Sequence, residues 1–394
     1  MTVPYVAIRL ARQMTMNNTL VFHNGHVLTD RGFERDVSVV VEDGYIVAVL
    51  PGDSTTTTAS TVDLQGTYLV PGFIDTQVNG GGDVLFNDEP TVEGLRRIAA
   101  AHRRFGTTGL MPTLISDDVA VMQRAIEAVR EAIAQNVPGI LGIHLEGPYL
   151  AEARKGVHDS HKFHMPDARE LDLVASLGVG KTMVTLAPER FAPETLHALT
   201  ERGVLVCAGH TAATYEQLRD AFAAGVRGVT HLFNAMTPLG SREPGGVGAS
   251  LEDPDSWCGI IVDGFHVHDA SLRVAIAAKP RGKMMLVTDA MPPVGGERED
   301  FTLYGIPMTC RDGKCSTAEG GLAGSALDMA GAVRNTVERV GLPLDEACRM
   351  ASTYPAEFLG LGSELGRIAP GYRADLVMLD PALHVQGNWI GGQA

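Results

Sequence analysis

A regular alternation of short apolar runs with helix-like stretches constrains the fold of this chain more than any other feature. From about residue 71 to residue 360, apolar runs alternate with amphipathic segments such as 91–106 and 117–135. This alternation predicts right-handed βαβ units and a parallel sheet. Eight apolar runs can be counted: 68–75, 109–115, 139–146, 182–189, 203–210, 228–233, 258–264 and 283–290. Eight parallel strands close a TIM barrel, which we predict as the catalytic domain over residues 71–360.

The two ends of the chain have a different sequence pattern, typical of short antiparallel strands. Residues 19–69 consist of short alternating strands, and Asn24-Gly25 and Asp43-Gly44 lie between apolar runs, where such dipeptides close tight hairpins. Residues 366–380 have the same character. We therefore predict that residues 1–70 and 361–394 together form a small β-sandwich, with residues 1–18 as a flexible extension.

Charge and hydropathy exclude several classes of partner. The net charge of −15 argues against binding to nucleic acid or to an anionic membrane, because phosphate contacts need clustered Lys and Arg. No stretch reaches 18 uninterrupted apolar residues, and Arg9 and Arg12 interrupt the apolar segment near the N-terminus, so we expect neither a membrane span nor a signal peptide. These features predict a cytoplasmic protein with a small-molecule substrate.

Cysteine usage agrees with a cytoplasmic setting. The chain has five cysteines, and none of them forms the C-x-x-C spacing of a structural zinc site. We expect all five to be reduced thiols: Cys207, Cys258, Cys310, Cys315 and Cys348.

Polar or ionisable residues follow the apolar core of most predicted barrel strands. The C-terminal strand ends of a TIM barrel form the mouth where catalysis takes place, so side chains far apart in sequence should meet there. The residues that we expect to converge are Asp75, Glu146, Glu189, His210, His231, Asp263 and Asp289.

Glu146, His210 and His231 are ligands of the types that bind Zn²⁺ with an open position for water. A single His at a strand end is more often structural than a ligand, but three such residues and an aspartate on one barrel favour a metal site. Asp289 is followed by Pro and Gly and could simply form a turn. Facing a metal-activated water, its carboxylate could instead take the proton and return it to a leaving amine.

Other candidates have two interpretations each. His158 lies in a loop with three histidines, which is either a metal-binding tract or a chance His-rich loop. The irregular spacing argues against a second metal site there, but one of the three could reach the mouth and polarise a carbonyl. Glu189 and Asp263 either orient neighbouring residues or bind substrate. The Gly-rich segment 231–248 is either a plain connection or a phosphate loop, with Arg242 as the best phosphate ligand and His266 as its partner.

Several motifs, taken in order, make the chain resemble a known family. They include HLEGPYL, KGVHD, AGHT, THLFNAM, REPGGVG, LVTDAM and LAGSAL. In these motifs, over nearly the whole chain after Thr19, the sequence resembles the N-acetylglucosamine-6-phosphate deacetylases of the amidohydrolase superfamily. The resemblance implies a TIM barrel with a small β-sandwich, a homodimer and a phosphorylated amino sugar as substrate.

The resemblance also implies roles for particular residues. One divalent metal per subunit would be held by Glu146, His210 and His231, with Zn²⁺ preferred and Fe²⁺, Co²⁺ or Mn²⁺ also compatible. Water activated on the metal would attack the acetyl carbonyl, with Asp289 as proton shuttle and His158 on the carbonyl oxygen. Contacts to the sugar phosphate would come from Asn234, Ala235, Arg242, His266 and the segment Leu322, Ala323 and Gly324, with Arg242 or His266 donated by the partner subunit.

One position departs from the wider superfamily, in which the first barrel strand ends in His-x-His and holds a second metal. Here the matching residues are Gln77 and Asn79. Neutral amides are poor Zn²⁺ ligands compared with imidazole, so we expect the second site to be empty or weak. Two alternatives stay open: a different amidohydrolase on the same barrel, since fold does not determine substrate, or a scaffold that has lost catalysis.

Overall fold

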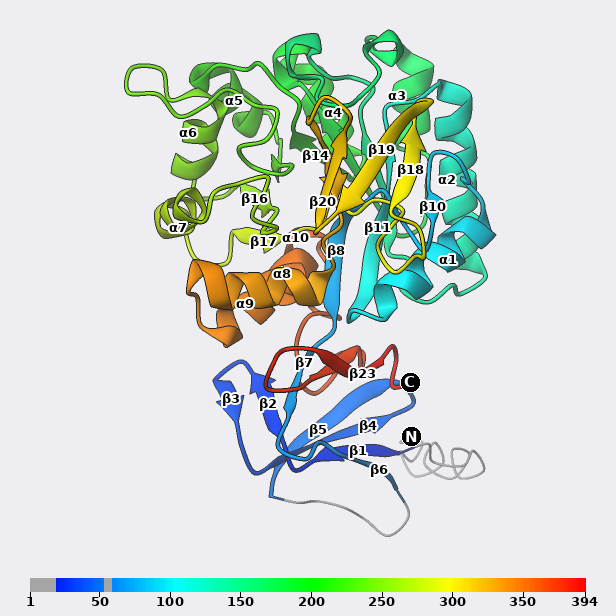
Figure 1. Ribbon diagram of the computed structural model, residues 1–394, viewed down its shortest axis with the longest axis vertical. Helices are drawn as coiled ribbons and strands as arrows, with labels where there is room; N and C mark the ends of the chain where they lie inside the picture. The colour runs from blue at the N-terminus through cyan, green and yellow to red at the C-terminus, as the bar shows by residue number, and fades with distance from the viewer. Residues whose placement is uncertain (1–18, 53–58) are drawn as a thin grey trace, which may run out of the picture.

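The computed structural model describes residues 19–52 and 59–394, so the extension predicted over residues 1–18 lies outside the described part. Its centre is a barrel of eight parallel strands, which confirms the predicted fold (Figure 1). An additional parallel bridge between Val78 and Ala290 links the last strand to the first and closes the ring. The strands in order are β8 (Phe73–Val78), β11 (Thr107–Ile115), β12 (Gly142–Glu146), β13 (Lys181–Leu186), β14 (Val204–Ala208), β15 (Gly228–Val229), β16 (Trp257–Ile260) and β17 (Met284–Leu286).

Helices cover the outside of the barrel. In α2, the residues buried against the strands include Met122, Ala125, Ile126 and Val129, at the spacing of one helix face. Every residue of β11 is buried, as expected for a strand with side chains packed on both faces. The helices are α1 (Val92–Arg103), α2 (Val119–Ala134), α3 (Ala168–Val174), α4 (Pro193–Glu201), α5 (Tyr215–Ala223), α6 (Gly245–Glu252), α7 (Asp269–Ala278), α8 (Met329–Asn335), α9 (Leu344–Ala351) and α10 (Thr353–Phe358). Among the described residues, no helix combines the length and apolarity needed to cross a membrane.

The first described segment of the chain, from residue 19, and the C-terminal segment meet in two further sheets, which lie below the barrel in Figure 1. Strand β22 pairs antiparallel with β7, so the C-terminal segment joins a sheet begun by the N-terminal one. Phe22 and Trp389 meet edge to face in the core of this region, with ring centroids 4.8 Å apart. The four-stranded sheet consists of β5 (Tyr45–Pro51), β4 (Val37–Glu42), β1 (Leu20–His23) and β6 (Ser60–Asp63). The five-stranded sheet consists of β23 (Val385–Trp389), β22 (Leu376–Leu379), β7 (Tyr68–Pro71), β2 (His26–Thr29) and β3 (Gly32–Glu34). The domain boundaries at residues 70 and 361 stay a prediction.

The apolar run 68–75, which we predicted as one barrel strand, is two strands that belong to different sheets. The chain changes partners at Gly72, whose amide donates to the carbonyl of Asp375, while the amide of Phe73 donates to Gly106 in the barrel. A side chain at Gly72 would collide with Thr108, so glycine permits this close passage. As a result Asp75 lies within β8 rather than at its end, and Asn79 follows the end of the strand.

An antiparallel sheet after β17 was not predicted. Its strands are β18 (Asp300–Leu303), β19 (Ile306–Arg311), β20 (Lys314–Thr317) and β21 (Leu322–Ser325). It packs against Ile115 and Met291 at the barrel mouth. Tyr304-Gly305 and Asp312-Gly313 join its first three strands. Asp312-Gly313 is a dipeptide typical of tight hairpins, so a search for such dipeptides could have found the second turn.

The prediction of five reduced cysteines is wrong for one pair. Cys310 and Cys315 form a disulfide. The pairing register places them directly opposite each other on β19 and β20, with Cα atoms 4.0 Å apart. Sequence spacing alone did not reveal this because the hairpin had not been recognised. Cys207, Cys258 and Cys348 are free and buried.

Candidate active site

A cavity of about 190 Å³ opens at the C-terminal ends of the barrel strands, where catalysis takes place in this fold. The predicted site residues that line it are Asn79, Glu146, His158, His210, His231, Asn234, Ala235, His266, Asp289, Leu322 and Gly324. Residues that were not predicted also contribute: Ile115, Gly156, Val157 and Met291. The tertiary structure thus gathers most of the predicted site into one cavity.

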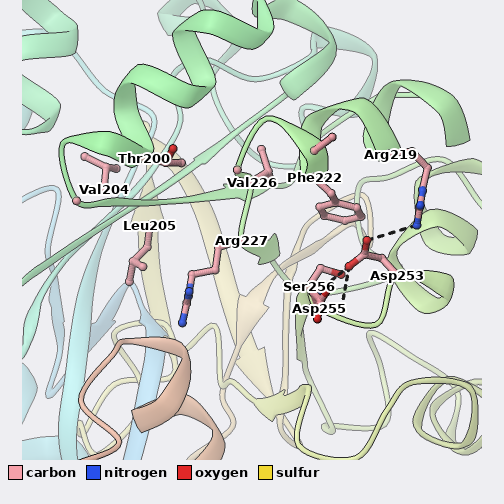
Figure 2. A pocket seen from close by; sticks show the side chains of 13 residues that line it. Thr200, Val204, Leu205, Arg219, Phe222, Val226, Arg227, Asp253, Asp255 and Ser256 are labelled. Atoms are coloured by element: carbon pink, nitrogen blue, oxygen red, sulfur yellow. Dashed lines mark hydrogen bonds and ion pairs between the residues drawn. The ribbon is translucent and has the colours of Figure 1, made fainter.

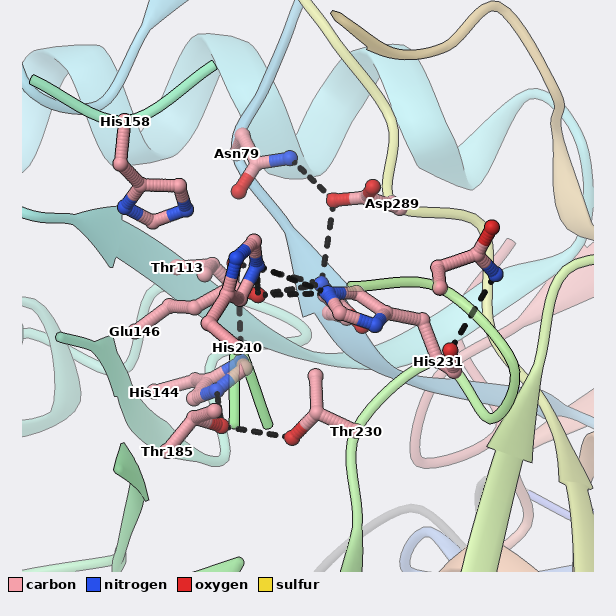
Figure 3. Close-up of polar contacts among 12 residues, drawn as sticks. Asn79, Thr113, His144, Glu146, His158, Thr185, His210, Thr230, His231 and Asp289 are labelled. Carbon is pink, nitrogen blue, oxygen red and sulfur yellow. Dashed lines mark hydrogen bonds and ion pairs between the residues drawn. The ribbon is translucent and has the colours of Figure 1, made fainter. Parts of the chain in front are cut away.

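Three of these side chains converge on one point (Figure 3). Glu146 is the last residue of β12, while His210 and His231 lie two residues beyond the ends of β14 and β15. Oε1 of Glu146 is 3.0 Å from Nε2 of His231 and 3.3 Å from Nε2 of His210, and the two imidazole nitrogens are 3.1 Å apart. All three residues are buried.

This arrangement fits a divalent metal. Ligand atoms of a tetrahedral zinc site with bonds of about 2.0 Å lie about 3.3 Å from one another. Two imidazoles and one carboxylate also form a common set of protein ligands in catalytic zinc sites. His158 could replace His231 in a second grouping with Glu146 and His210, but those atoms are only within 4.8 Å of one another. The shorter separations favour the grouping with His231.

The backbone at this site is held in an unusual conformation. His210, His231 and Asp289 have φ angles of 47°, 33° and 54°, in the left-handed region that non-glycine residues seldom adopt. Such conformations persist only where surrounding contacts impose them, and they cluster at functional sites. They turn the three side chains into the mouth just after the strands end.

Gln77 and Asn79 connect the carboxylates of the site. Nε2 of Gln77 lies 3.2 Å from both oxygens of Glu146 and 3.1 Å from Oδ1 of Asp289. Nδ2 of Asn79 donates to the same Oδ1 at 2.7 Å. Burial, followed by the nearby Glu146 carboxylate, raises the pKa of Asp289. The two amides therefore stabilise one oxygen of a carboxyl group that has a raised affinity for a proton.

Two neutral histidines adjoin the metal grouping. Burial and the neighbouring His210 lower the pKa of His158 to about 3, so its ring is uncharged at neutral pH. Beneath Glu146, burial lowers the pKa of His144 to about 4, and this ring contacts Thr113 and Thr185. Sequence reasoning missed His144, although its position two residues before Glu146 in a strand places it on the same face.

Two further strand-end acids have orienting contacts. Oδ1 of Asp263 accepts the backbone amides of Phe265 and His266, and its Oδ2 lies 2.6 Å from Nδ1 of His266. Glu189 accepts the amide of Ala212 at 2.7 Å and the hydroxyl of Thr211 at 2.5 Å, in the loop after His210. Of the two interpretations of these acids, the contacts match the one in which they orient neighbours.

Asp75, Glu189 and Asp263 do not line the cavity, and neither do three of the residues predicted to bind metal or substrate. Arg242 is exposed, in the loop before α6. Ala323 is buried in the core between the antiparallel sheet and the barrel mouth. Gln77 is buried and acts on the site through Glu146 and Asp289.

A cavity of about 500 Å³ lies where β14, β15 and β16 begin, at the opposite end of the barrel (Figure 2). Both of its arginines are already paired: Arg219 with Asp253, and Arg227 with the backbone carbonyls of Glu357 and Phe358. Catalysis is not expected at this end of a TIM barrel, because the active sites of this fold lie at the C-terminal ends of the strands. We therefore place the chemistry in the smaller cavity.

Comparison with known proteins identifies the family. A model of the amidohydrolase family matches residues 68–394. The chain belongs to the amidohydrolase family. Among its relatives, an N-acetylgalactosamine-6-phosphate deacetylase from Shewanella sp. (strain ANA-3) is 43% identical over 376 residues, covering 95% of each chain. An N-acetylglucosamine-6-phosphate deacetylase from Haemophilus influenzae is 37% identical, covering 91% of this chain and 94% of the relative.

Solved structures of amidohydrolases agree with this assignment. N-acetylglucosamine-6-phosphate deacetylase from Pasteurella multocida superposes with a TM-score of 0.92 at 34% identity, covering 95% of this chain and 99% of that one. A mutant of the Mycobacterium smegmatis enzyme, in complex with N-acetyl-D-glucosamine 6-phosphate, superposes with a TM-score of 0.88 at 33% identity, covering 96% and 99%. The fold and the family are therefore shared over nearly the full length.

Proposed function

We propose that this amidohydrolase removes the acetyl group from N-acetyl-D-glucosamine 6-phosphate, releasing D-glucosamine 6-phosphate and acetate. The observation that carries the proposal is the convergence of Glu146, His210 and His231 beside Asp289 at the barrel mouth. Relatives that cover nearly the whole chain and have this substrate class in their names support it. We further propose Zn²⁺ as the metal, with Fe²⁺, Co²⁺ or Mn²⁺ as substitutes, and a cytoplasmic location.

A metal held by Glu146, His210 and His231 would polarise the acetyl carbonyl and lower the pKa of the attacking water. Asp289 takes the proton from that water as its oxygen bonds to the carbonyl carbon. Because Oδ1 of Asp289 already accepts amide hydrogens from Gln77 and Asn79, the proton is held on Oδ2. Asp289 then passes it to the sugar nitrogen as the carbon–nitrogen bond breaks, so the water supplies the acetate oxygen and the amine hydrogen.

His158 faces the cavity as an uncharged ring, and we assign it to the acetyl carbonyl oxygen. A neutral imidazole can donate one hydrogen bond to the oxygen as negative charge develops there. Asn234, Ala235, His266 and the segment 322–324 surround the remaining space, where the sugar and its phosphate would lie. We propose that the backbone of this segment, rather than the buried Ala323 side chain, contacts the substrate.

A second candidate substrate is the galacto epimer. Two relatives, at 43% and 38% identity, are N-acetylgalactosamine-6-phosphate deacetylases. The two sugars differ only in the configuration at C4, so the same hydrolytic residues serve both. Acetate release from both 6-phosphates, compared as kcat/KM, decides between them. A larger kcat/KM for the galacto sugar would assign the second candidate, and no release from either sugar by metal-loaded protein would refute both.

Arg242 provides a test of the phosphate assignment. A charge-assisted hydrogen bond contributes about 1.5–3 kcal/mol, so Arg242→Ala should raise KM for the phosphorylated sugar by about 10- to 100-fold. Hydrolysis of unphosphorylated N-acetylglucosamine should change little. Steady-state kinetics on the two sugars measures this difference, and an equal loss on both would contradict a phosphate contact. Arg35, an exposed arginine of the terminal sheets, supplies the control Arg35→Ala.

We propose that Arg242 serves the cavity of the partner subunit in a homodimer, since it is exposed and does not line its own cavity. His266 lines the cavity of its own chain and needs no partner. Mixing Arg242→Ala subunits with Asp289→Asn subunits under exchange should then restore about a quarter of wild-type activity, because one site in each mixed dimer is intact. No recovery despite verified subunit exchange would place Arg242 in its own chain's site or outside it.

A further inference from the structure

The environment of His158 contains a buried hydroxyl that the proposed mechanism does not use. Ser116 directly follows β11 and is only 1% exposed. Its Oγ lies 2.8 Å from Nδ1 of His158, and its backbone nitrogen lies 3.4 Å from the same atom. The hydroxyl and the backbone N–H of Ser116 therefore both contact Nδ1 of His158.

These contacts determine which ring nitrogen of His158 carries the hydrogen. A backbone N–H can only donate, so Nδ1 must accept, and in a neutral imidazole the hydrogen is then on Nε2. The neighbouring His210 has the opposite arrangement. Its Nδ1 lies 2.8 Å from the carbonyl oxygen of Arg154, which can only accept, so its Nε2 keeps a free lone pair.

We propose that Ser116 is a positioning residue of the active site, which holds His158 in the tautomer that donates from Nε2 to the acetyl oxygen. This inference rests on the proposed function for its catalytic consequence. The same hydrogen bonds distinguish two histidines whose rings are 4.4 Å apart: His210 is left able to bind a metal, and His158 is left able to donate.

The surroundings of Ser116 are shaped around its hydroxyl. A Cβ atom on Gly147 would come within 2.2 Å of Ser116 Oγ, so the glycine after Glu146 leaves room for it. The hydroxyl of Tyr304 also donates to the backbone carbonyl of Ser116 at 2.6 Å. Tyr304 lies in the turn between β18 and β19, so the antiparallel sheet that contributes Leu322 and Gly324 to the cavity also supports Ser116.

The test combines kinetics with a direct reading of the tautomer in the Zn²⁺-loaded protein. Loss of an orienting partner typically costs 10- to 100-fold, and the backbone donor remains in Ser116→Ala, so kcat should fall about 10-fold with KM little changed. Ser352→Ala is the matched control, because this serine is also fully buried and donates to a backbone carbonyl, that of Cys348. Metal content and melting temperature of Ser116→Ala should match those of the control.

Long-range ¹H–¹⁵N spectra of ¹⁵N-histidine-labelled protein should show His158 protonated at Nε2 and unprotonated at Nδ1, with assignment from His158→Gln. In Ser116→Ala the Nδ1-protonated form should increase. A wild-type His158 protonated at Nδ1, or a Ser116→Ala kcat within about twofold of the control, would overturn the proposal. If Ser116→Ala does not fold, the wild-type spectrum and the near-isosteric Ser116→Cys decide. The spectrum needs no substrate, so failure of the proposed function would appear separately as absent acetate release.

Discussion

Asp289→Asn should lower kcat by about 10³-fold while the metal stays bound, because general acid–base catalysis contributes roughly 10²- to 10⁴-fold. Asparagine keeps the size of the side chain and an oxygen that can accept from Gln77 and Asn79. It cannot carry a proton from water to the leaving amine. Rapid-quench measurement of acetate release, together with elemental analysis of the same sample, gives both quantities.

Asp263→Asn is the matched control for this substitution. Asp263 is also an acid just after a barrel strand, but its contacts are to the backbone of Phe265 and His266 and to the His266 ring. It should therefore lose much less kcat than Asp289→Asn. A nearly normal rate in Asp289→Asn, or equal losses in both variants, would be incompatible with proton transfer by Asp289.

The second prediction with a large effect distinguishes the roles of His210 and His158, whose rings are in contact. His210→Gln should reduce bound metal to below about a tenth of the wild-type content, because it removes a ligand from a three-ligand set. Turnover should fall by at least about 10³-fold, since the metal supplies several kcal/mol of transition-state stabilisation. His158→Gln should keep the metal and lose about 10²-fold in kcat, the typical cost of one oxyanion donor.

Metal content by elemental analysis and kcat by acetate release measure both variants under one loading protocol. Normal metal content in His210→Gln would contradict its role as a ligand, because both possible groupings contain His210. Loss of metal in His158→Gln would favour the grouping of Glu146, His158 and His210 over the one with His231. Both substitutions place a Gln side chain at a buried position. Each variant therefore controls for the general effect of replacing a buried histidine with glutamine.

Much of the fold follows from local patterns in the sequence. The alternation of apolar runs with amphipathic helices predicted all eight barrel strands, because a strand buried on both faces must be apolar along its length. The same patterns did not locate the change of sheet at Gly72, since two strands with no turn between them form one apolar run. The antiparallel sheet over 300–325 was missed, and with it the disulfide between Cys310 and Cys315.

Residue types at strand ends were enough to nominate Glu146, His210, His231 and Asp289, because parallel strands of a closed barrel end at one rim. Only the tertiary structure decided how these groups act on one another. It joined Gln77 and Asn79 to a single oxygen of Asp289, and Ser116 to a single nitrogen of His158. Sequence alone specifies which donors and acceptors exist, whereas the direction of a hydrogen bond depends on which partners the folded chain brings within about 3 Å.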